Sequence, residues 1–372
     1  MFLKKVNSLN KKLQYGYVRI GILGEISRLG GGQVYMKSLI NALKNNDLTL
    51  ISNFIMDPLN ISELVNNKIN VNYFYRDEDN YIKVLLKVLK LKKELININK
   101  KFDLLINNHP NIFLKKGNLN IFHGMSFLDP IIDEYGNVEN KIILNLIKIS
   151  GIFKLYNNAN FIVNSEYTRG IVEKTLPLLN LKVTIIGSLY PTFNFVNKIS
   201  TGNKILIFGR INKRKNIDQF LNVAGKINKK VIIAGAVNEG QDFDNYKYLK
   251  KIAPENVEFY PNPDEGQKEE LFLKSKIYVH ISKKEHFGIS VVEAMSHGLI
   301  PVVPKSGGPW IDIINKDEYG LGYDNYNDIP DCIDKAYNLN DEFKKNIINS
   351  VDRFSENNFK NNLNEIINKV NS

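Results

Sequence analysis

The sequence predicts an α/β fold with two doubly wound domains, each built around a mostly parallel sheet. Short apolar runs with strand character alternate with longer helical patterns along the chain, as in parallel sheets covered by helices. A stretch rich in proline, serine, glycine and asparagine interrupts this series at residues 188–203. The 372 residues are enough for two domains of ordinary size, so we expect one on each side of this linker.

Seven runs before the linker and five after it have the composition of buried strands. The first seven occupy residues 17–25, 48–57, 69–77, 102–109, 119–124, 158–166 and 181–187. The other five occupy residues 204–210, 230–236, 256–262, 277–282 and 299–303. We therefore place the first domain at residues 1–192 and the second at residues 200–352. The remaining segment, 353–372, has a helical pattern that could pack on either domain.

The composition is that of a globular protein, with 43% hydrophobic and 24% charged residues. A single cysteine, Cys332, excludes an intrachain disulfide and is typical of a reducing compartment. The first residues lack the apolar segment of a secretion signal, and no run of about 18 apolar residues could span a bilayer. We expect a cytoplasmic protein, and leave open a peripheral contact with the cytoplasmic face of a membrane.

The net charge of +11 favours an anionic partner, which could be nucleic acid, an anionic membrane or a small anionic substrate. The basic residues are spread along the whole chain, as on an ordinary solvated surface. The sequence has no RNA-binding signature, zinc-finger spacing or basic low-complexity tail. We therefore do not expect nucleic acid as the partner.

The loop after the run 204–210 carries the first candidate site. In open parallel sheets, ligands bind beyond the carboxyl ends of the strands, where loops lead into helices. Gly209 opens this turn, Arg210 follows it, and Lys215 precedes the next helical pattern. A guanidinium fork and an ammonium point charge together suit a diphosphate. The loop therefore predicts a diphosphate site.

Two carboxylates, Glu285 and Glu293, flank a turn at Gly288 that precedes a short helical pattern. The backbone N–H groups of residues 287–290 would form the N-terminus of this helix, which attracts anions. The turn could hold phosphate while the two carboxylates accept hydroxyl groups on either side. A ligand with phosphate in the middle and polyols at both ends is a nucleotide sugar, which is the ligand we predict.

Further glycine-rich turns follow other predicted strands. Gly307 and Gly308 precede Pro309 at the expected start of a helix, and such small residues could let the backbone approach a ligand. In the first domain, Gly31 and Gly32 precede a helical pattern. These turns are weak signals by themselves, because loop geometry also explains them.

His123 lies at the carboxyl end of the run 119–124, directly before a glycine. A lone histidine is more often structural than catalytic. Its place at a strand end favours function, and spacing alone leaves both interpretations open.

With these residues assembled, the chain resembles the retaining GT-B glycosyltransferases of the large family four. The segment EHFGISVVEAM fits the E-x7-E signature of that family at Glu285 and Glu293. Residues 286–309 are particularly similar to the eukaryotic mannosyltransferases that extend a dolichol-linked oligosaccharide. GGGQVYM is similar to the N-terminal glycine-rich loop of the family, the His-Gly pair at His123 to its acceptor-side histidine, and GRINKRKN to its diphosphate-binding arginine and lysine.

The resemblance implies a GT-B fold, in which two Rossmann-like domains face each other across a cleft and the final helix, from about residue 353, returns to the N-terminal domain. It also implies retention of configuration by a front-face route, with a GDP- or UDP-sugar as donor and no metal or other cofactor. The acceptor would be a hydroxyl of a glycan or of a lipid-linked acceptor.

The resemblance assigns roles to the candidate residues. Glu293 would hydrogen-bond the ribose, Glu285 would face the donor sugar, and His123 would contact the sugar near the reacting centre. Arg210 and Lys215 would neutralise the departing diphosphate. The implied catalytic set is His123, Arg210, Lys215 and Glu285, and the donor-binding set is Gly31, Gly32, Gly209, Arg210, Lys215, Phe287, Gly288, Ile289 and Glu293.

One departure leaves the basic partner open. The family often has Lys-Gly after the arginine turn, whereas Asn216 follows Lys215 here. Lys213 or Arg214 could therefore be the true diphosphate partner, although we expect both in a solvated loop.

Other interpretations belong to different classes. A non-catalytic nucleotide-sugar-binding protein would bind the donor without transferring or hydrolysing it. A metal-dependent GT-A-type transferase would use Asp77 and Asp79, which we expect in a solvated loop. A dinucleotide oxidoreductase would use Gly21 and Gly24, but the third glycine of its fingerprint is missing.

Two segments of the first domain bear on the acceptor. Residues 82–101 and 141–156 combine apolar and lysine positions with a helical pattern. Either they pack on the sheet with their lysines in solvent, or they touch an anionic membrane that carries a lipid-linked acceptor.

Overall fold

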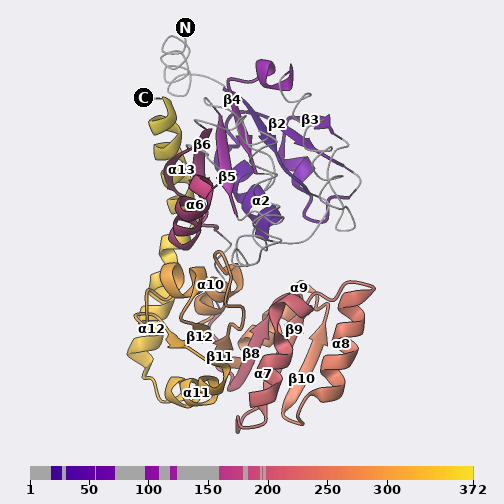
Figure 1. Ribbon diagram of the computed structural model, residues 1–372. Coiled ribbons are helices and arrows are strands. Elements are labelled where there is room, and N and C mark those ends of the chain that lie inside the picture. The colour runs from indigo at the N-terminus through magenta and orange to yellow at the C-terminus, as the bar shows by residue number, and fades with distance from the viewer. Residues whose placement is uncertain are drawn as a thin grey trace. The chain divides into compact units, whose positions relative to one another are not determined.

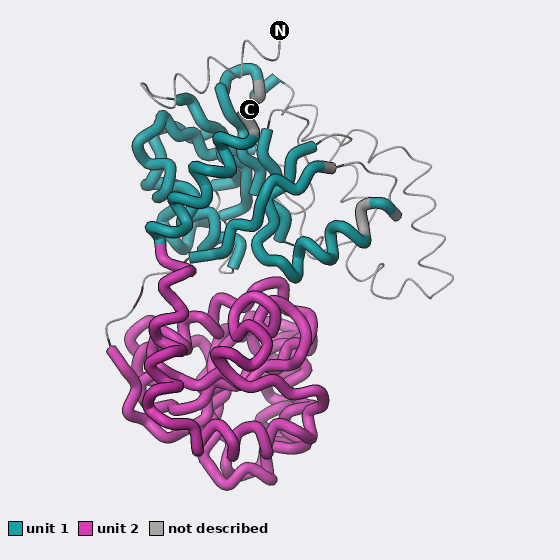
Figure 2. The backbone as a smooth tube through the Cα atoms, turned by 90° about the vertical axis from the view of Figure 1, so that its left-hand side faces the viewer, with its two compact units in different colours: residues 1–192, 356–372 teal, residues 193–355 magenta. Residues whose placement is uncertain are grey.

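The structure, a computed structural model, describes residues 18–26, 31–54, 56–71, 97–108, 118–123, 159–178, 183–192, 195 and 198–371. The chain divides into two compact units, shown in different colours in Figure 2. Unit 1 comprises residues 1–192 and 356–372, and unit 2 comprises residues 193–355. The limits expected from the sequence, 200–352 for the second domain and 353 for the return of the chain, lie a few residues inside those of unit 2.

Unit 1 contains a seven-stranded parallel sheet in the order β3-β2-β1-β4-β5-β6-β7 (Figure 1). The strands are β1 (Arg19–Leu23), β2 (Asp47–Ser52), β3 (Asn67–Asn70), β4 (Leu104–Asn107), β5 (Leu119–Phe122), β6 (Ala159–Val163) and β7 (Val183–Ser188). Each of the seven runs predicted for the first domain overlaps one of them. The chain builds outward from β1 to β3 and then crosses back to β4. The pair β1–β4 is therefore the topological switch point of this sheet.

The helices of unit 1 include one from the far end of the chain. They are α2 (Gly31–Leu43), α6 (Glu166–Leu178) and α13 (Glu356–Asn371), with the 3-10 turns η1 (Ile61–Leu64) and η2 (Asn99–Lys101). Phe359 of α13 meets the ring of Tyr35 in α2 edge to face, with 5.5 Å between the ring centroids. Leu363 and Ile366 are buried in the same core. Burial of these apolar side chains holds α13 in unit 1.

Unit 2 contains a six-stranded parallel sheet in the order β10-β9-β8-β11-β12-β13. The strands are β8 (Lys204–Phe208), β9 (Val231–Gly235), β10 (Val257–Pro261), β11 (Ser275–Val279), β12 (Ile300–Pro304) and β13 (Leu321–Tyr323). The sequence predicted five of them and missed β13, because a strand of three residues centred on Gly322 has no apolar run to mark it. The strand order reverses between β8 and β11, which form the switch point of unit 2.

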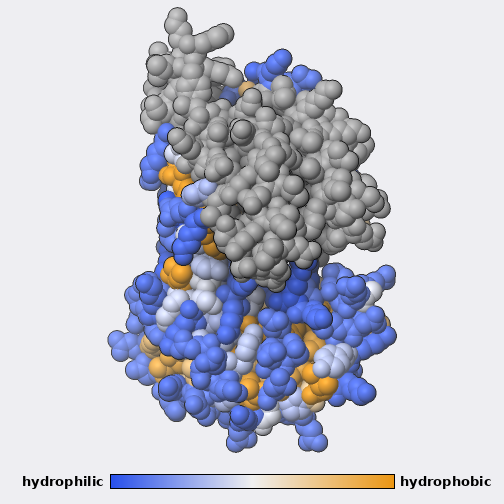
Figure 3. Space-filling view, in the orientation of Figure 1, coloured by the Kyte–Doolittle hydropathy of each residue, from blue (hydrophilic) through white to orange (hydrophobic). Residues whose placement is uncertain are grey.

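The helical elements of unit 2 lie along this sheet (Figure 1). They are η4 (Lys213–Lys215), α7 (Ile217–Ala224), α8 (Gln241–Ile252), α9 (Glu265–Leu273), α10 (Ile289–Ser296), η5 (Pro309–Ile313), η6 (Tyr326–Asp328), α11 (Ile329–Tyr337), α12 (Asp341–Ser350) and η7 (Val351–Phe354). The face of unit 2 in Figure 3 is mainly hydrophilic, with small apolar patches. Among the described residues, no helix has the length and apolar character needed to cross a membrane.

Candidate functional site

A small cavity of about 80 Å³ lies at the carboxyl edge of the sheet of unit 2, beside the switch point between β8 and β11. The segment after β8 contributes Gly209, Arg210 and Lys215 to its lining, and the segment after β11 contributes His280 and Ser282. Because open parallel sheets bind ligands at this position, the cavity is the candidate ligand site of unit 2.

The turn η4 separates its three basic side chains. Lys213 and Arg214 are exposed, whereas Lys215 is half-buried and lines the cavity. Asn216 adopts the left-handed conformation, with φ 51° and ψ 41°. Glycine adopts this conformation most easily, and asparagine is one of the few other residues that tolerate it. Asn216 therefore makes the turn expected of the family's glycine, and the geometry favours Lys215 over its neighbours as the basic group of the site.

Lys215 is paired with the first of the two motif carboxylates. Its Nζ donates a hydrogen bond to Glu285 Oε2 over 2.6 Å, and the Glu285 side chain is 27% exposed. Burial opposes ionisation of Glu285, but the charge and hydrogen bond of Lys215 outweigh it. The pKa of this carboxyl is consequently lowered. The lysine that lines the cavity is thus in direct contact with an ionised carboxylate.

His280, which the sequence analysis did not single out, lies beside this pair. Its Nε2 is 3.9 Å from Glu285 Oε2, and the residue is 6% exposed. Burial lowers the pKa of His280 to about 4, with Lys215 acting in the same direction and Glu285 opposing. The imidazole is therefore neutral at physiological pH.

The loop that carries Glu285 is held by the backbone of the loop after β12. Gly308 N–H donates to the Glu285 carbonyl oxygen over 2.8 Å. A Cβ atom on Gly307 would lie 2.8 Å from that same oxygen, and one on Gly308 would lie 2.3 Å from the carbonyl oxygen of His286. We expected these glycines to let the backbone approach a ligand. The structure shows that they also let two loops pack backbone to backbone, which helps to position Glu285.

The first turn of α10 is tied to both central strands. Gly288, directly before α10, has φ 101°, which glycine adopts without strain. Ser290 Oγ lies 2.7 Å from the hydroxyl of Tyr278, and that hydroxyl donates to the carbonyl oxygen of Phe208 over 2.9 Å. Because Ser290 also lines the cavity, these contacts set the N-terminus of α10 at the cavity edge.

Phe287 and Ile289 flank Gly288, and Phe287 faces away from solvent. Its ring packs edge to face on Phe354 of η7, with 5.4 Å between the centroids, and both rings are buried. We expected donor contacts from this turn. Because the ring of Phe287 is buried, this residue can contact a donor only through its backbone.

Glu293, the second motif carboxylate, is paired with a different lysine. Lys268 Nζ of α9 lies 2.6 Å from Glu293 Oε1, and the two side chains are 21% and 20% exposed. Burial opposes the charge on Lys268, but Glu293 outweighs it, so the pKa of the ammonium is raised. The carbonyl oxygen of Glu293 also lies 2.8 Å from His297 Nδ1. The structure thus holds the two motif carboxylates through two separate lysines.

The predicted residues of unit 1 gather at the switch point of its own sheet. Asn108 directly follows β4, its Oδ1 lies 2.6 Å from His123 Nε2, and its Nδ2 donates to the Gly32 carbonyl oxygen over 3.0 Å. Gly31 and Gly32 are the first two residues of α2, and the ring of Tyr35 meets that of His123 edge to face at 4.6 Å. Asn108 therefore links the predicted histidine to the predicted glycine-rich turn.

Within the part of the chain that the structure describes, no cluster of three or more His, Cys, Asp or Glu side chains could hold a metal ion. Asp77 and Asp79, the pair considered for a metal-dependent transferase, lie outside the described residues. So do the predicted helical segment 141–156 and most of the segment 82–101.

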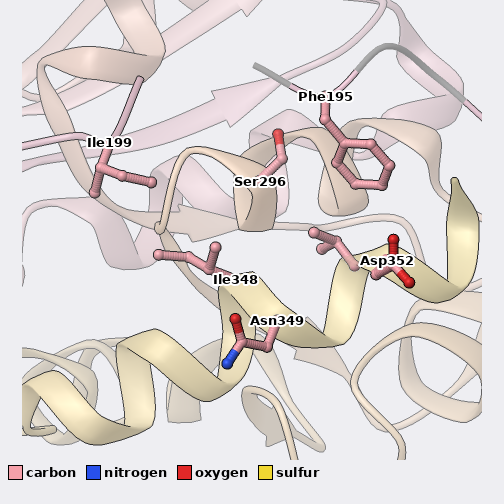
Figure 4. Close-up of a pocket in the computed structure, with 7 residues that line it drawn as sticks. Phe195, Ile199, Ser296, Ile348, Asn349 and Asp352 are labelled. Atoms are coloured by element: carbon pink, nitrogen blue, oxygen red, sulfur yellow. The ribbon is translucent and has the colours of Figure 1, made fainter. Parts of the chain in front are cut away.

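A second cavity, of about 420 Å³, shares no lining residue with the first. Figure 4 shows Ile348, Asn349 and Asp352 on the helical segment that ends in η7, with Phe195 and Ile199 on the opposite wall. Ser296, at the end of α10, also lines it, and its hydroxyl donates to the Glu293 carbonyl oxygen over 2.7 Å. The lining contains no basic side chain, so this cavity does not suit a diphosphate.

The family model described as glycosyl transferases group 1 matches residues 191–359, which span unit 2 and its boundaries. Unit 2 is therefore similar to glycosyl transferases group 1. The match places this domain's cavity, with Arg210, Lys215 and Glu285, inside the matched region.

Two curated relatives of the chain are mannosyltransferases. The chain is 32% identical over 143 residues to a GDP-Man:Man(3)GlcNAc(2)-PP-Dol alpha-1,2-mannosyltransferase of Dictyostelium discoideum, covering 36% of this chain and 28% of the relative. It is 24% identical over 248 residues to the alpha-1,3/1,6-mannosyltransferase ALG2 of Kluyveromyces lactis, covering 53% and 47%. The chain therefore spans less than half the length of either relative.

Solved structures resemble nearly the whole chain. Sucrose-phosphate synthase from Thermosynechococcus elongatus has a TM-score of 0.71 at 15% identity, covering 94% of this chain and 98% of that one. Anabaena HepE in complex with UDP-glucose has a TM-score of 0.67 at 14% identity, covering 94% and 99%. With the two parallel sheets, this likeness confirms the predicted GT-B fold class.

Proposed function

We propose that the chain is a retaining glycosyltransferase that moves a hexosyl group from a nucleotide-diphosphate sugar to a hydroxyl of a glycan or lipid-linked acceptor. One observation carries the proposal. At the switch point of unit 2, Arg210 and Lys215 line a small cavity together with Ser290 of the first turn of α10, and Lys215 is paired with Glu285. Two cations beside a helix N-terminus suit a diphosphate, and a carboxylate beside them suits the hydroxyl groups of a sugar.

Each group has a distinct task in this reaction. As the bond between the anomeric carbon and the diphosphate breaks, negative charge grows on the leaving oxygen. Arg210 and Lys215 stabilise that charge, and the N-terminus of α10 adds a fixed dipole. The acceptor hydroxyl enters on the side from which the diphosphate departs, so the anomeric configuration is retained. Protein cations supply the charge stabilisation, and the transferase needs no metal.

Lys215 links donor binding to the exposure of Glu285. In the structure its ammonium is bound to the carboxylate of Glu285. A diphosphate offers Lys215 a stronger, doubly charged partner. When the ammonium turns toward the diphosphate, the carboxylate becomes available to accept hydrogen bonds from the sugar. We propose Glu293 as the acceptor of the ribose hydroxyls, and His123 with Gly31 and Gly32 as the contribution of unit 1.

The donor is GDP-mannose or a UDP-sugar, and we favour GDP-mannose. The name of the Dictyostelium discoideum relative includes GDP-Man, whereas HepE was solved with UDP-glucose. Isothermal titration calorimetry with GDP, UDP, GDP-mannose and UDP-glucose distinguishes a GDP-mannose donor from a UDP-sugar donor. Binding of at least one of these at micromolar to millimolar concentration is expected. Binding of none of them would refute the proposed function.

Transfer is tested with the donor that binds. We expect release of the nucleoside diphosphate in the presence of an acceptor, and EDTA should not reduce the rate. NMR of the product should show the same anomeric configuration as in the donor. Donor binding without transfer or hydrolysis would indicate a non-catalytic nucleotide-sugar-binding protein. An inverted product would refute the retaining mechanism.

Glu293→Gln is expected to weaken nucleotide binding because the neutral amide loses a charged acceptor for the ribose hydroxyls. Hydrogen bonds to a charged group contribute about 1.5–3 kcal/mol, which corresponds to about 10- to 100-fold in Kd. Calorimetry with the nucleoside diphosphate measures this. Glu270→Gln is the matched control, since Glu270 lies on the surface of α9 with 61% of its side chain exposed. Equal affinity in Glu293→Gln and wild type would contradict the role of Glu293.

Peripheral contact with an anionic membrane is part of the proposal for a lipid-linked acceptor. The basic charge of the chain, +11, favours binding to vesicles that contain acidic lipids. We expect co-sedimentation with such vesicles at low salt and its loss at high salt, because screening shortens the range of the attraction. No co-sedimentation at low salt would refute the membrane contact.

A further inference from the structure

The backbone of His280 is fully engaged, and its side chain has a hydrogen bond to the backbone of Ser282 but none at Nε2. Its N–H donates to the Val302 carbonyl oxygen over 2.9 Å, and its own carbonyl oxygen accepts from the Tyr323 hydroxyl over 2.9 Å. Its Nε2 is buried and has no hydrogen-bond partner among the residues that the structure describes. Buried polar atoms of folded proteins nearly always have a partner, so this nitrogen requires an explanation.

The position of the unpaired nitrogen points to a ligand. His280 directly follows β11 at the switch point and lines the same cavity as Arg210 and Lys215. The side chain is 7% exposed, and the paired backbone on both sides holds the residue in place. A buried imidazole nitrogen that lines a ligand cavity and has no partner can form its hydrogen bond with a polar atom of the ligand.

The chemistry around Nε2 identifies the part of the ligand. Glu285 Oε2 lies 3.9 Å away, and its negative charge repels a phosphate at this point. The imidazole is neutral, so it offers a phosphate no charge in return. A hydroxyl group both donates and accepts hydrogen bonds. It can therefore pair with Nε2 in either tautomer of the ring, and it can donate to the neighbouring carboxylate.

The spacing also fits hydroxyl groups. Hydrogen-bonded oxygens lie about 2.8 Å from their partners, so a group between two atoms 3.9 Å apart can reach both of them. Neighbouring hydroxyl groups on one sugar ring could equally engage one atom each. The two cations of the cavity, Arg210 and Lys215, remain for the diphosphate.

We propose that His280 is a donor-sugar contact, whose Nε2 hydrogen-bonds a hydroxyl of the hexosyl group beside Glu285. This inference rests on the proposed function, because it specifies which part of the nucleotide sugar reaches the floor of the cavity. It makes His280 a determinant of the affinity for the sugar and leaves the affinity for the nucleoside diphosphate to other residues.

The test compares two ligands that differ only in the sugar. Calorimetry measures Kd for GDP and GDP-mannose, and for UDP and UDP-glucose, with wild type, His280→Leu and His280→Gln. Leucine has a similar volume and no hydrogen-bonding atom, whereas glutamine retains an amide. We expect His280→Leu to raise Kd for the nucleotide sugar about tenfold and to change Kd for the nucleoside diphosphate less than about twofold. His280→Gln should recover part of the lost affinity.

The outcomes distinguish this inference from the proposed function. If wild type binds neither the nucleoside diphosphates nor the nucleotide sugars, the proposed function fails and this inference fails with it. If wild type binds them and His280→Leu loses affinity for both kinds of ligand equally, or for neither, the inference alone is wrong. A thermal melt of each variant guards against a folding defect, since His280→Leu also removes the hydrogen bond between the ring and the backbone of Ser282.

Discussion

Arg210→Ala is expected to lower kcat for sugar transfer by about 100- to 1,000-fold, the usual cost of removing one preorganised donor from a developing negative charge. Arg210 lies at the carboxyl end of β8, where it lines the cavity with Lys215. Lys215 alone cannot replace it, because an ammonium offers one point charge whereas a guanidinium binds two oxygens at once. Initial rates at saturating donor measure the effect, since they isolate the step in which the diphosphate departs.

Arg210→Ala should not change the stability of the fold. Arg210 is exposed, so its truncation removes little packing, and the melting temperature should match that of wild type. Arg214→Ala is the matched control, because Arg214 is an exposed arginine of the adjacent turn η4 and does not line the cavity. An unchanged kcat in Arg210→Ala, or an equal loss in Arg214→Ala, would contradict the proposed role of Arg210.

Gly308→Ala is expected to displace the loop of Glu285 and so to weaken donor binding by about tenfold or more. The added Cβ would lie 2.3 Å from the carbonyl oxygen of His286 and 2.7 Å from the Cα of Phe287, and both of these are backbone atoms that cannot rotate away. Overpacking of this kind costs about 1–3 kcal/mol of stability. Calorimetry with the nucleotide sugar and urea unfolding of the full chain measure the two effects.

Gly225→Ala provides a control of the opposite sign. Both glycines have right-handed helical dihedral angles, φ −60° and ψ −39° at Gly308 and φ −63° and ψ −18° at Gly225. A Cβ on Gly225 would meet only the side chain of Pro254, at 3.8 Å. Its substitution should therefore leave donor affinity unchanged and stabilise the chain by about 0.4–1 kcal/mol. If both variants behave alike, the packing of the two loops does not position Glu285.

The strands were predictable because parallel strands are buried on both faces and read as continuous apolar runs. β9 (Val231–Gly235), with every residue buried, is a clear case. β13 escaped prediction because it pairs with β12 over three residues and contains Gly322, so its position depends on tertiary contacts.

The choice among three consecutive basic residues was not predictable from the sequence. The dihedral angles of the turn decide which of Lys213, Arg214 and Lys215 reaches the cavity. The sequence does not show that Asn216 adopts the left-handed conformation that sets this turn. The packing role of Gly307 and Gly308 was also not predictable. A glycine pair signals a close approach, and the sequence does not say whether a ligand or another loop is approached.

The positions of His280 and Asn108 in the sequence resemble that of His123, which was predicted as a site residue. Both lie in the carboxyl-terminal half of a predicted strand run, as His123 does, and directly follow an observed strand, so the same rule would have selected them. Lys268 had no such signal. Its contact with Glu293 joins α9 to α10 across 25 residues of chain, and only the packing of the two helices in space determines it.

A crystal structure of the protein with the nucleoside diphosphate that binds is the most direct test of the diphosphate site at Arg210 and Lys215. We expect diphosphate oxygens within hydrogen-bonding distance of the Arg210 guanidinium and the Lys215 ammonium, next to the first turn of α10. Lys215 should then have moved away from Glu285. A nucleotide bound elsewhere, or bound with Lys215 still paired to Glu285 and Arg210 in solvent, would contradict this expectation.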